Sequence, residues 1–151
     1  MTLYCDMDGV LTDFERAYYE LTGVDIQGQH LSDAGFWEPI TKAGVQFWSE
    51  MHWKKDGKEL WEFIKPYNPK LLSAPSRENS SRVGKKLWVE NHLPGTELLL
   101  RSAERKKDLA KHGDILIDDR EDNVIGWREN GGIGILHVNT KNTIAELKNY
   151  L

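Results

Sequence analysis

The sequence has few of the features that mark secreted or membrane-bound proteins. Cys5 is the single cysteine among 151 residues, which excludes an internal disulfide and fits a reducing compartment. No apolar run approaches the length of a membrane span, and the N-terminus lacks the charged-then-apolar pattern of a signal peptide. We therefore expect a cytoplasmic protein that does not enter a membrane.

An excess of basic residues is also missing. Twenty Lys plus Arg face 24 Asp plus Glu, for a formal net charge of -4 at pH 7. This balance argues against a generally basic nucleic-acid binder. A zinc site has little support, because no metal-ligand spacing relates the histidines, which are His30, His52, His92, His112 and His137.

Short apolar runs without polar alternation predict a parallel β-sheet covered on both faces. Such runs lie at residues 2–6, 69–74, 97–101, 114–118 and 134–138. Helical patterns lie between or after them, at 79–92, 123–129 and 143–150. Strands that alternate with helices indicate an α/β domain with right-handed crossovers.

The longest of these helical patterns is the first. Its apolar residues Val83, Leu87 and Trp88 fall on one face of a helix with 3.6 residues per turn. We expect this face to pack on the core, with Lys85 and Lys86 outside.

The segment from about residue 17 to residue 65 breaks the alternation and contains no convincing strand. Helical candidates lie at 13–21, 42–51 and 57–65. Eleven of the 15 aromatic residues lie between Phe14 and Tyr67. They fit a helical subdomain with an aromatic core, a helical cap with rings that line a pocket, or both at once. We expect a core domain of residues 1–16 and 68–151, with residues 17–67 as the cap.

Acidic residues follow two of the predicted strands. Asp6 and Asp8 come at the end of the first strand, and Asp118 and Asp119 end the fourth. Each pair alone also fits a turn or a solvated helix start. The carboxyl ends of parallel strands meet at one edge of the sheet, where ligands bind. Because buried carboxylates repel each other unless a cation compensates them, the two pairs predict a shared Mg²⁺ site.

A hydroxyl and a lysine lie between the acid pairs in the chain. Ser73 ends the second strand, where it could hold a phosphate oxygen or simply cap a helix. Lys106 and Lys107 follow the third strand. We prefer Lys106 as the functional lysine, because it lies four residues before Ala110 on the following helix. The order acid pair, hydroxyl, lysine, acid pair is far more specific than any one member.

This order resembles the four motifs of the haloacid-dehalogenase-like (HAD) phosphatase superfamily. A response-regulator receiver domain also uses acids, a hydroxyl and a lysine, but in another order. Four segments look like the 5′(3′)-deoxyribonucleotidase branch: DMDGVLTDF at 6–14, LSAP at 72–75, LWVENHL at 87–93 and GDILIDD at 113–119. The cap shares only its length, helical character and aromatic content, and Ser73 stands where these nucleotidases often have threonine.

The resemblance implies a Rossmann-like three-layer parallel sheet with a small helical cap inserted after the first strand. It also implies the reaction, in which Asp6 attacks phosphorus to form an aspartyl-phosphate. Asp8 would protonate the departing oxygen and then deprotonate the hydrolytic water. Ser73 and Lys106 would bind the transferring phosphoryl oxygens.

The same resemblance implies how Mg²⁺ is held. The carboxylates of Asp6 and Asp119 and the backbone carbonyl of Asp8 would be its ligands. Asp118, with Asp122 as a further candidate, would hold metal-bound water.

The expected substrate is a small phosphate ester, most specifically a nucleoside monophosphate. Candidate substrate-binding residues are Phe36, Trp37, Phe47 and Trp48 for base stacking, with Ala74 and Arg77 beside the phosphate. The alternatives are another small phosphometabolite, 3′-phosphate ends of nucleic acid, and a non-catalytic binding module of the same fold. The acidic balance counts against a polynucleotide, and a homodimer is left open.

Overall fold

A five-stranded, all-parallel sheet forms the centre of the computed structural model, which describes residues 1–27 and 33–151. The strands are β1 (Leu3–Cys5), β2 (Lys70–Ser73), β3 (Leu98–Leu100), β4 (Ile115–Asp118) and β5 (Ile133–Leu136). Their order across the sheet is β3-β2-β1-β4-β5. All five predicted runs therefore form strands, with small shifts at their ends.

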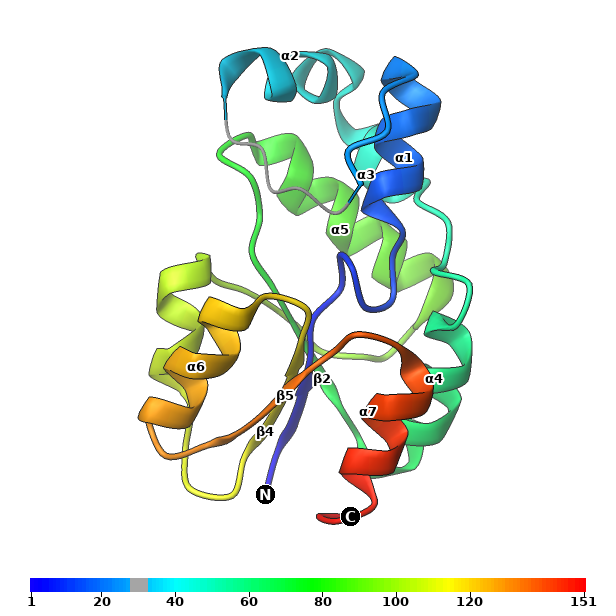
Figure 1. Cartoon of the computed structure of the whole chain (residues 1–151). Helices are drawn as coiled ribbons and strands as arrows, with labels where there is room; N and C mark the ends of the chain where they lie inside the picture. The colour runs from blue at the N-terminus through cyan, green and yellow to red at the C-terminus, as the bar shows by residue number, and fades with distance from the viewer. Residues whose placement is uncertain (28–32) are drawn as a thin grey trace.

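Helices cover both faces of this sheet (Figure 1). One face carries α4 (Gly57–Ile64) and α7 (Thr140–Leu147), and the other carries α6 (Glu121–Glu129) and the 3-10 helix η2 (Ala103–Leu109). Successive strand residues bury opposite faces, so that Leu3 and Cys5 pack with the α4 side while Tyr4 packs with Trp127 of α6. The predicted three-layer α/β fold is confirmed.

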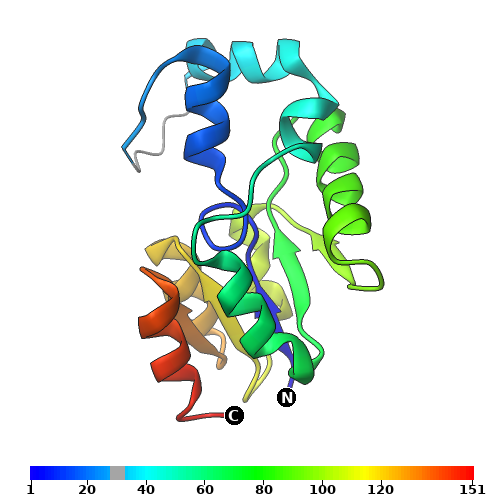
Figure 2. The ribbon, with the colours of Figure 1, turned by 90° about the vertical axis from the view of Figure 1, so that its right-hand side faces the viewer.

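Three further helices lie beyond the carboxyl edge of the sheet (Figures 1 and 2). They are α1 (Phe14–Thr22), α2 (Ala34–Ala43) and α3 (Val45–Ser49). Helix α2 was not predicted; it contains Pro39 and is capped by Asp33, whose carboxylate accepts a hydrogen bond from the backbone N–H of Phe36. Helix α4 belongs to the expected cap segment but packs against α7, and the division at 17–67 stays a prediction. His30 lies in residues 28–32, outside the described part of the chain.

The helices beyond the sheet share an aromatic core centred on Phe14. Its ring centroid lies 5.6 to 6.4 Å from the rings of Tyr18, Phe36, Trp37, Phe47 and Trp48. Tyr18 also donates its hydroxyl to the backbone carbonyl of Phe36, at 3.0 Å. The aromatic residues clustered in this part of the sequence therefore hold its helices together.

Helix α5 (Asn79–His92) has the predicted bounds but buries a different face. Val83 and Leu87 are 40% and 39% exposed, and Lys85 is 1% exposed, so their predicted orientations were wrong. Trp88 is buried and Lys86 is exposed, as expected.

The physical reason for the rotated face of α5 is its contact with α3, above the sheet (Figure 2). A Cβ atom on Gly84 would lie 2.7 Å from the carbonyl oxygen of Val45 and would overlap the Cβ of Trp48. The smallest residue of α5, rather than a large apolar one, therefore marks its packed side. Of the helices in the described ranges, none has the length and apolarity that a bilayer span requires.

Candidate active site

The carboxyl edge of the sheet brings the four predicted motifs together. Asp6 directly follows β1, and its backbone N–H donates to the carbonyl of Ile117 in β4 at 2.9 Å. Ser73 ends β2, Lys106 lies in η2 after β3, and Asp118 ends β4. Parallel pairing of the strands thus places side chains from distant parts of the chain at one edge.

Three carboxylates face one another at this edge. Asp6, Asp118 and Asp119 each offer an oxygen, and these atoms all lie within 4.8 Å of one another. Burial, reinforced by the charge of Asp118, raises the pKa of Asp6 well above its usual range. Burial likewise raises the pKa of Asp119. A cluster of carboxylate oxygens at this spacing fits a hard divalent cation such as Mg²⁺.

Both oxygens of Asp118 already accept hydrogen bonds from the protein. Oδ1 accepts from the backbone N–H of Arg120 at 3.0 Å. Oδ2 accepts from Lys106 Nζ at 2.9 Å and from Asn123 Nδ2 at 3.2 Å. Asp118 therefore orients its neighbours, an arrangement compatible with an indirect part in metal binding.

Lys106 bridges the two strands that carry the acids. Its ammonium lies 3.0 Å from Asp6 Oδ1 and 2.9 Å from Asp118 Oδ2, and the side chain is 2% exposed. Burial by itself would lower the pKa of Lys106, but the two carboxylates outweigh it and raise that pKa. Lys107 is exposed, so the structure brings Lys106 and not Lys107 to the acids.

A tight turn positions Asp8. The backbone N–H groups of Val10, Leu11 and Thr12 all donate to the carbonyl of Met7, at 2.8 to 3.0 Å. Gly9 has a φ of +87°, and a Cβ atom there would overlap the carboxylate of Asp119. Glycine is therefore required for both the turn and the closeness of the second acid pair.

Lys85 also lies in the site, although it was predicted to be exposed. Its ammonium lies 2.7 Å from Asp8 Oδ2 and 2.8 Å from Ser73 Oγ. One sequence pattern indicates its burial: Trp88 and Val89, three and four residues later, are buried on the same face of the helix. Four carboxylates (Asp6, Asp8, Asp118, Asp119) and two ammonium groups then leave the site with a formal charge that a divalent cation would neutralise.

The predicted substrate-binding residues divide by their exposure. Phe36, Phe47 and Trp48 are buried in the aromatic core around Phe14, while Trp37 is half-buried. Ala74 is half-buried directly after Ser73, and Arg77 is exposed ahead of α5. Base stacking by these rings stays a prediction, and Trp37 keeps the most accessible surface of the four.

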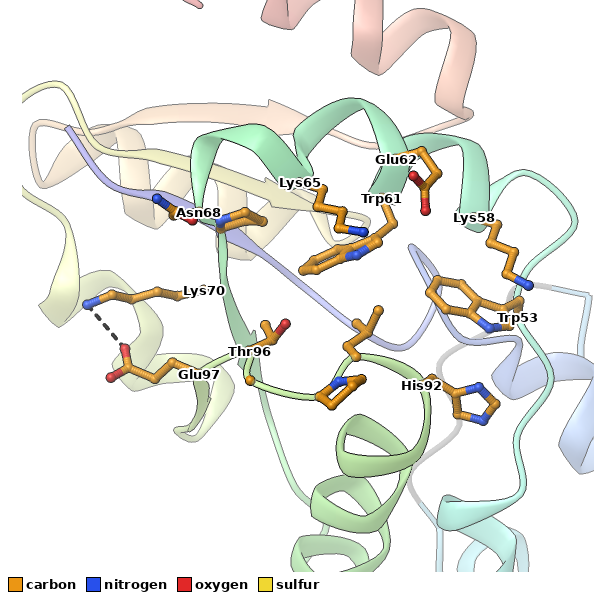
Figure 3. A pocket seen from close by; sticks show the side chains of 14 residues that line it. Trp53, Lys58, Trp61, Glu62, Lys65, Asn68, Lys70, His92, Thr96 and Glu97 are labelled. Carbon is orange, nitrogen blue, oxygen red and sulfur yellow. Dashed lines mark ion pairs between the residues drawn. The ribbon is translucent and has the colours of Figure 1, made fainter.

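A groove of about 500 Å³ lies away from the acid pairs (Figure 3). Trp53, Trp61 and His92 are among its lining residues, and an ion pair of 3.1 Å between Lys70 and Glu97 lies at one end. Lys70 begins β2, so this end lies at the edge of the sheet opposite Ser73. The chemistry of the side chains, rather than the size of a hollow, identifies the candidate active site.

The structure is similar to those of solved hydrolases. A hydrolase from Streptococcus pneumoniae TIGR4 has a TM-score of 0.56 and 12% identity, over 97% of each chain. A HAD-superfamily hydrolase from Ehrlichia chaffeensis has a TM-score of 0.54 and 13% identity, over 99% of this chain and 96% of its own. A HAD family hydrolase from Deinococcus radiodurans R1, with bound phosphate and sodium, has a TM-score of 0.50 and 10% identity, over 88% and 78%.

These likenesses show that the chain has the fold of HAD-superfamily hydrolases. No family model matches the sequence, and no curated protein matches it. The fold is therefore shared, while the reaction has to be argued from the site.

Proposed function

We propose that this protein is a Mg²⁺-dependent phosphomonoesterase that works through an aspartyl-phosphate on Asp6, with nucleoside monophosphates, deoxyribonucleotides foremost, as substrates. The observation that carries the reaction class is the buried contact of Lys106 with Asp6 and Asp118, beside Asp119. Such a set combines a nucleophile, a fixed positive charge and oxygen ligands for a divalent cation. Phosphoryl transfer needs mainly this positioning and charge compensation.

In the first step, an oxygen of Asp6 attacks phosphorus and the bond from phosphorus to the ester oxygen breaks. Asp8 gives a proton to that departing oxygen, which leaves as an alcohol. In the second step, Asp8 takes a proton from a water molecule as the water attacks phosphorus, and the Asp6 carboxylate is released. Lys106 and Ser73 bind phosphoryl oxygens throughout.

The carboxylates of Asp6 and Asp119 and the backbone carbonyl of Asp8 would hold Mg²⁺. When bound, the ion supplies positive charge that offsets the charges of the phosphate and the carboxylates. The carboxylate oxygens of Asp6, Asp118 and Asp119 support this assignment, because they lie within 4.8 Å of one another and such a cluster suits a hard divalent cation.

Support for a nucleotide substrate comes from the resemblance of residues 72–75 and 87–93 to deoxyribonucleotidases. The phosphate bound to the Deinococcus radiodurans neighbour agrees with a phosphate ester. One observation favours a second candidate, a phosphate ester without a base. Phe36, Phe47 and Trp48 are buried in the aromatic core, so Trp37 would have to supply most of the stacking.

The test is phosphate release by purified protein with Mg²⁺ from dUMP, dTMP, UMP, 3′-dUMP, glycerol 3-phosphate and 4-nitrophenyl phosphate. We expect turnover that EDTA and Asp6→Asn abolish, with the highest kcat/KM for a deoxyribonucleotide. Trp37→Leu should raise KM for dUMP but not for 4-nitrophenyl phosphate, with the exposed Tyr19→Leu as the matched control. Folded protein that releases no phosphate from any ester would refute the reaction class. Equal kcat/KM for esters with and without a nucleobase would refute the nucleotide assignment but not the reaction class.

A further inference from the structure

A second buried lysine serves the other half of the site. Lys85 is 1% exposed, and its ammonium lies between Asp8 Oδ2 at 2.7 Å and Ser73 Oγ at 2.8 Å. Burial of an ammonium is costly unless charged and hydrogen-bonding partners surround it. Asp8 and Ser73 therefore provide the partners that make the burial of Lys85 favourable, as Asp6 and Asp118 do for Lys106.

Both oxygens of the Asp8 carboxylate accept hydrogen bonds. Oδ1 accepts from Thr12 Oγ1 at 2.7 Å, and Oδ2 accepts from Lys85. Thr12 belongs to the same turn as Asp8, whereas Lys85 is 77 residues away in α5. Lys85 is thus the donor that fixes Asp8 relative to β2 and its Ser73.

The contact of Lys85 with Ser73 also directs the serine hydroxyl. An ammonium has three donors and no acceptor, so Ser73 Oγ must accept this hydrogen bond. The hydrogen of the Ser73 hydroxyl is then available to another acceptor, and a phosphoryl oxygen is the acceptor that the proposed function provides.

Helix packing holds the lysine in place. Gly84 lets α5 approach α3 closely, and the next residue, Lys85, places its ammonium 4.9 Å from the centre of the Trp48 ring. A cation over an indole face is attracted to it. The long side chain is therefore enclosed between the helices beyond the sheet and the carboxyl edge of the sheet.

We propose that Lys85 is a positioning residue, which holds the Asp8 carboxylate toward the leaving-group oxygen and leaves the Ser73 hydroxyl free to donate to the phosphoryl group. This inference rests on the proposed function and deepens it. Lys106 contacts the proposed nucleophile, Asp6, whereas Lys85 contacts the proposed acid–base group, Asp8. Loss of Lys85 should therefore impair protonation of the departing oxygen more than attack on phosphorus.

The test compares two aryl esters in the presence of Mg²⁺. Phenyl phosphate has a poor leaving group that needs a proton, while 2,4-dinitrophenyl phosphate has a good one that does not. We expect Lys85→Met to lower kcat/KM about 100-fold for phenyl phosphate and less than about 10-fold for 2,4-dinitrophenyl phosphate, since general acid catalysis contributes about 10²–10⁴. Lys85→Arg should recover part of the phenyl phosphate rate, and Lys86→Met, the exposed neighbour, should change neither.

Equal losses on the two esters, or no loss, would overturn the positioning role. Hydrolysis of neither ester by the wild-type protein would instead refute the proposed function, and with it this role.

A second experiment measures the coupling of Lys85 and Asp8 through protein stability, without substrate, and therefore applies even if Lys85→Met folds poorly. In a double-mutant cycle of urea denaturation, Asp8→Asn should rescue part of the stability lost in Lys85→Met, because it removes the uncompensated charge. Additive effects on stability would show that the two groups are not coupled, contrary to the proposal.

Discussion

Lys106 Nζ lies 3.0 Å from Asp6 Oδ1, although 100 residues separate the two in the chain. The same ammonium reaches Asp118 at the end of β4. Positive charge beside the proposed nucleophile is therefore part of the folded core and does not depend on a ligand.

Lys106→Met should remove the fixed charge at Asp6 while Lys107→Met should not. We expect kcat/KM for 4-nitrophenyl phosphate to fall about 10²–10³-fold in the first variant, as for loss of one preorganised donor. The second variant should stay within about twofold of wild type, because Lys107 is exposed. Steady-state kinetics measure the rates, with circular dichroism to confirm folding. Equal losses in the two variants would contradict the assignment of Lys106.

Mg²⁺ should stabilise the wild-type protein, and Asp119→Asn should abolish most of that effect. At a hundredfold excess over Kd, a ligand specific for the folded state adds about 2.7 kcal/mol to the free energy of unfolding. Without Mg²⁺, Asp119→Asn should be no less stable than wild type, because burial and neighbouring carboxylates raise the pKa of Asp119. Thermal denaturation with Mg²⁺ or EDTA measures both effects.

The matched control for that metal test is Asp122→Asn. Asp122, named above as a further candidate for holding metal-bound water, is exposed and paired with Arg120 at 2.9 Å, outside the group of three carboxylates. Its substitution should leave the stabilisation by Mg²⁺ nearly intact. A Mg²⁺ effect that survives Asp119→Asn unchanged would place the ion elsewhere.

Gly9→Ala should disable the site for a reason beyond backbone strain. Gly9 and Gly131 both have left-handed backbones, with φ of +87° and +91°. A Cβ on Gly9 would overlap Asp119, whereas one on Gly131 would meet nothing within 4 Å. We expect Gly131→Ala to cost about 1–2 kcal/mol of stability with unchanged activity. Gly9→Ala should also lose Mg²⁺-induced stabilisation and catalysis, and comparable activity of the two variants would refute this account.

His137 should make stability depend on pH near neutrality. Burial lowers its pKa from the usual value of 6.5, and its ring accepts or donates one hydrogen bond, Nδ1 to Thr143 Oγ1, at 2.8 Å. The unfolded chain then binds this proton more readily than the folded one. The stability contribution is complete above pH 6.5 and falls as the pH drops from there to the folded pKa.

The measurement is urea denaturation of wild type, His137→Gln and the exposed His112→Gln at pH 7.5 and 5.5. The loss of stability on acidification should be smaller in His137→Gln than in wild type, by at most about 1.4 kcal/mol per pH unit. His112→Gln should follow wild type. The same loss in all three proteins would rule out His137 as its source.

Strand positions and the residues at strand ends could be predicted because they depend on local patterns. Each strand is a short apolar run, and a side chain that ends a parallel strand must lie at the carboxyl edge. Asp6, Ser73 and Asp118 follow from this rule alone. Helix α2 could not be predicted in this way, because Pro39 and the glycines around it also signal a turn.

The sequence by itself determined the α/β fold and the edge where Asp6 and Asp118 meet, since both follow from neighbours in the chain. Only the tertiary structure decided which face of α5 is buried. That choice depends on the close approach of α3 to Gly84 and on the Asp8 carboxylate, which lies 77 residues from Lys85. A lysine is solvated by default, and only carboxylates brought to it by the fold make its burial favourable.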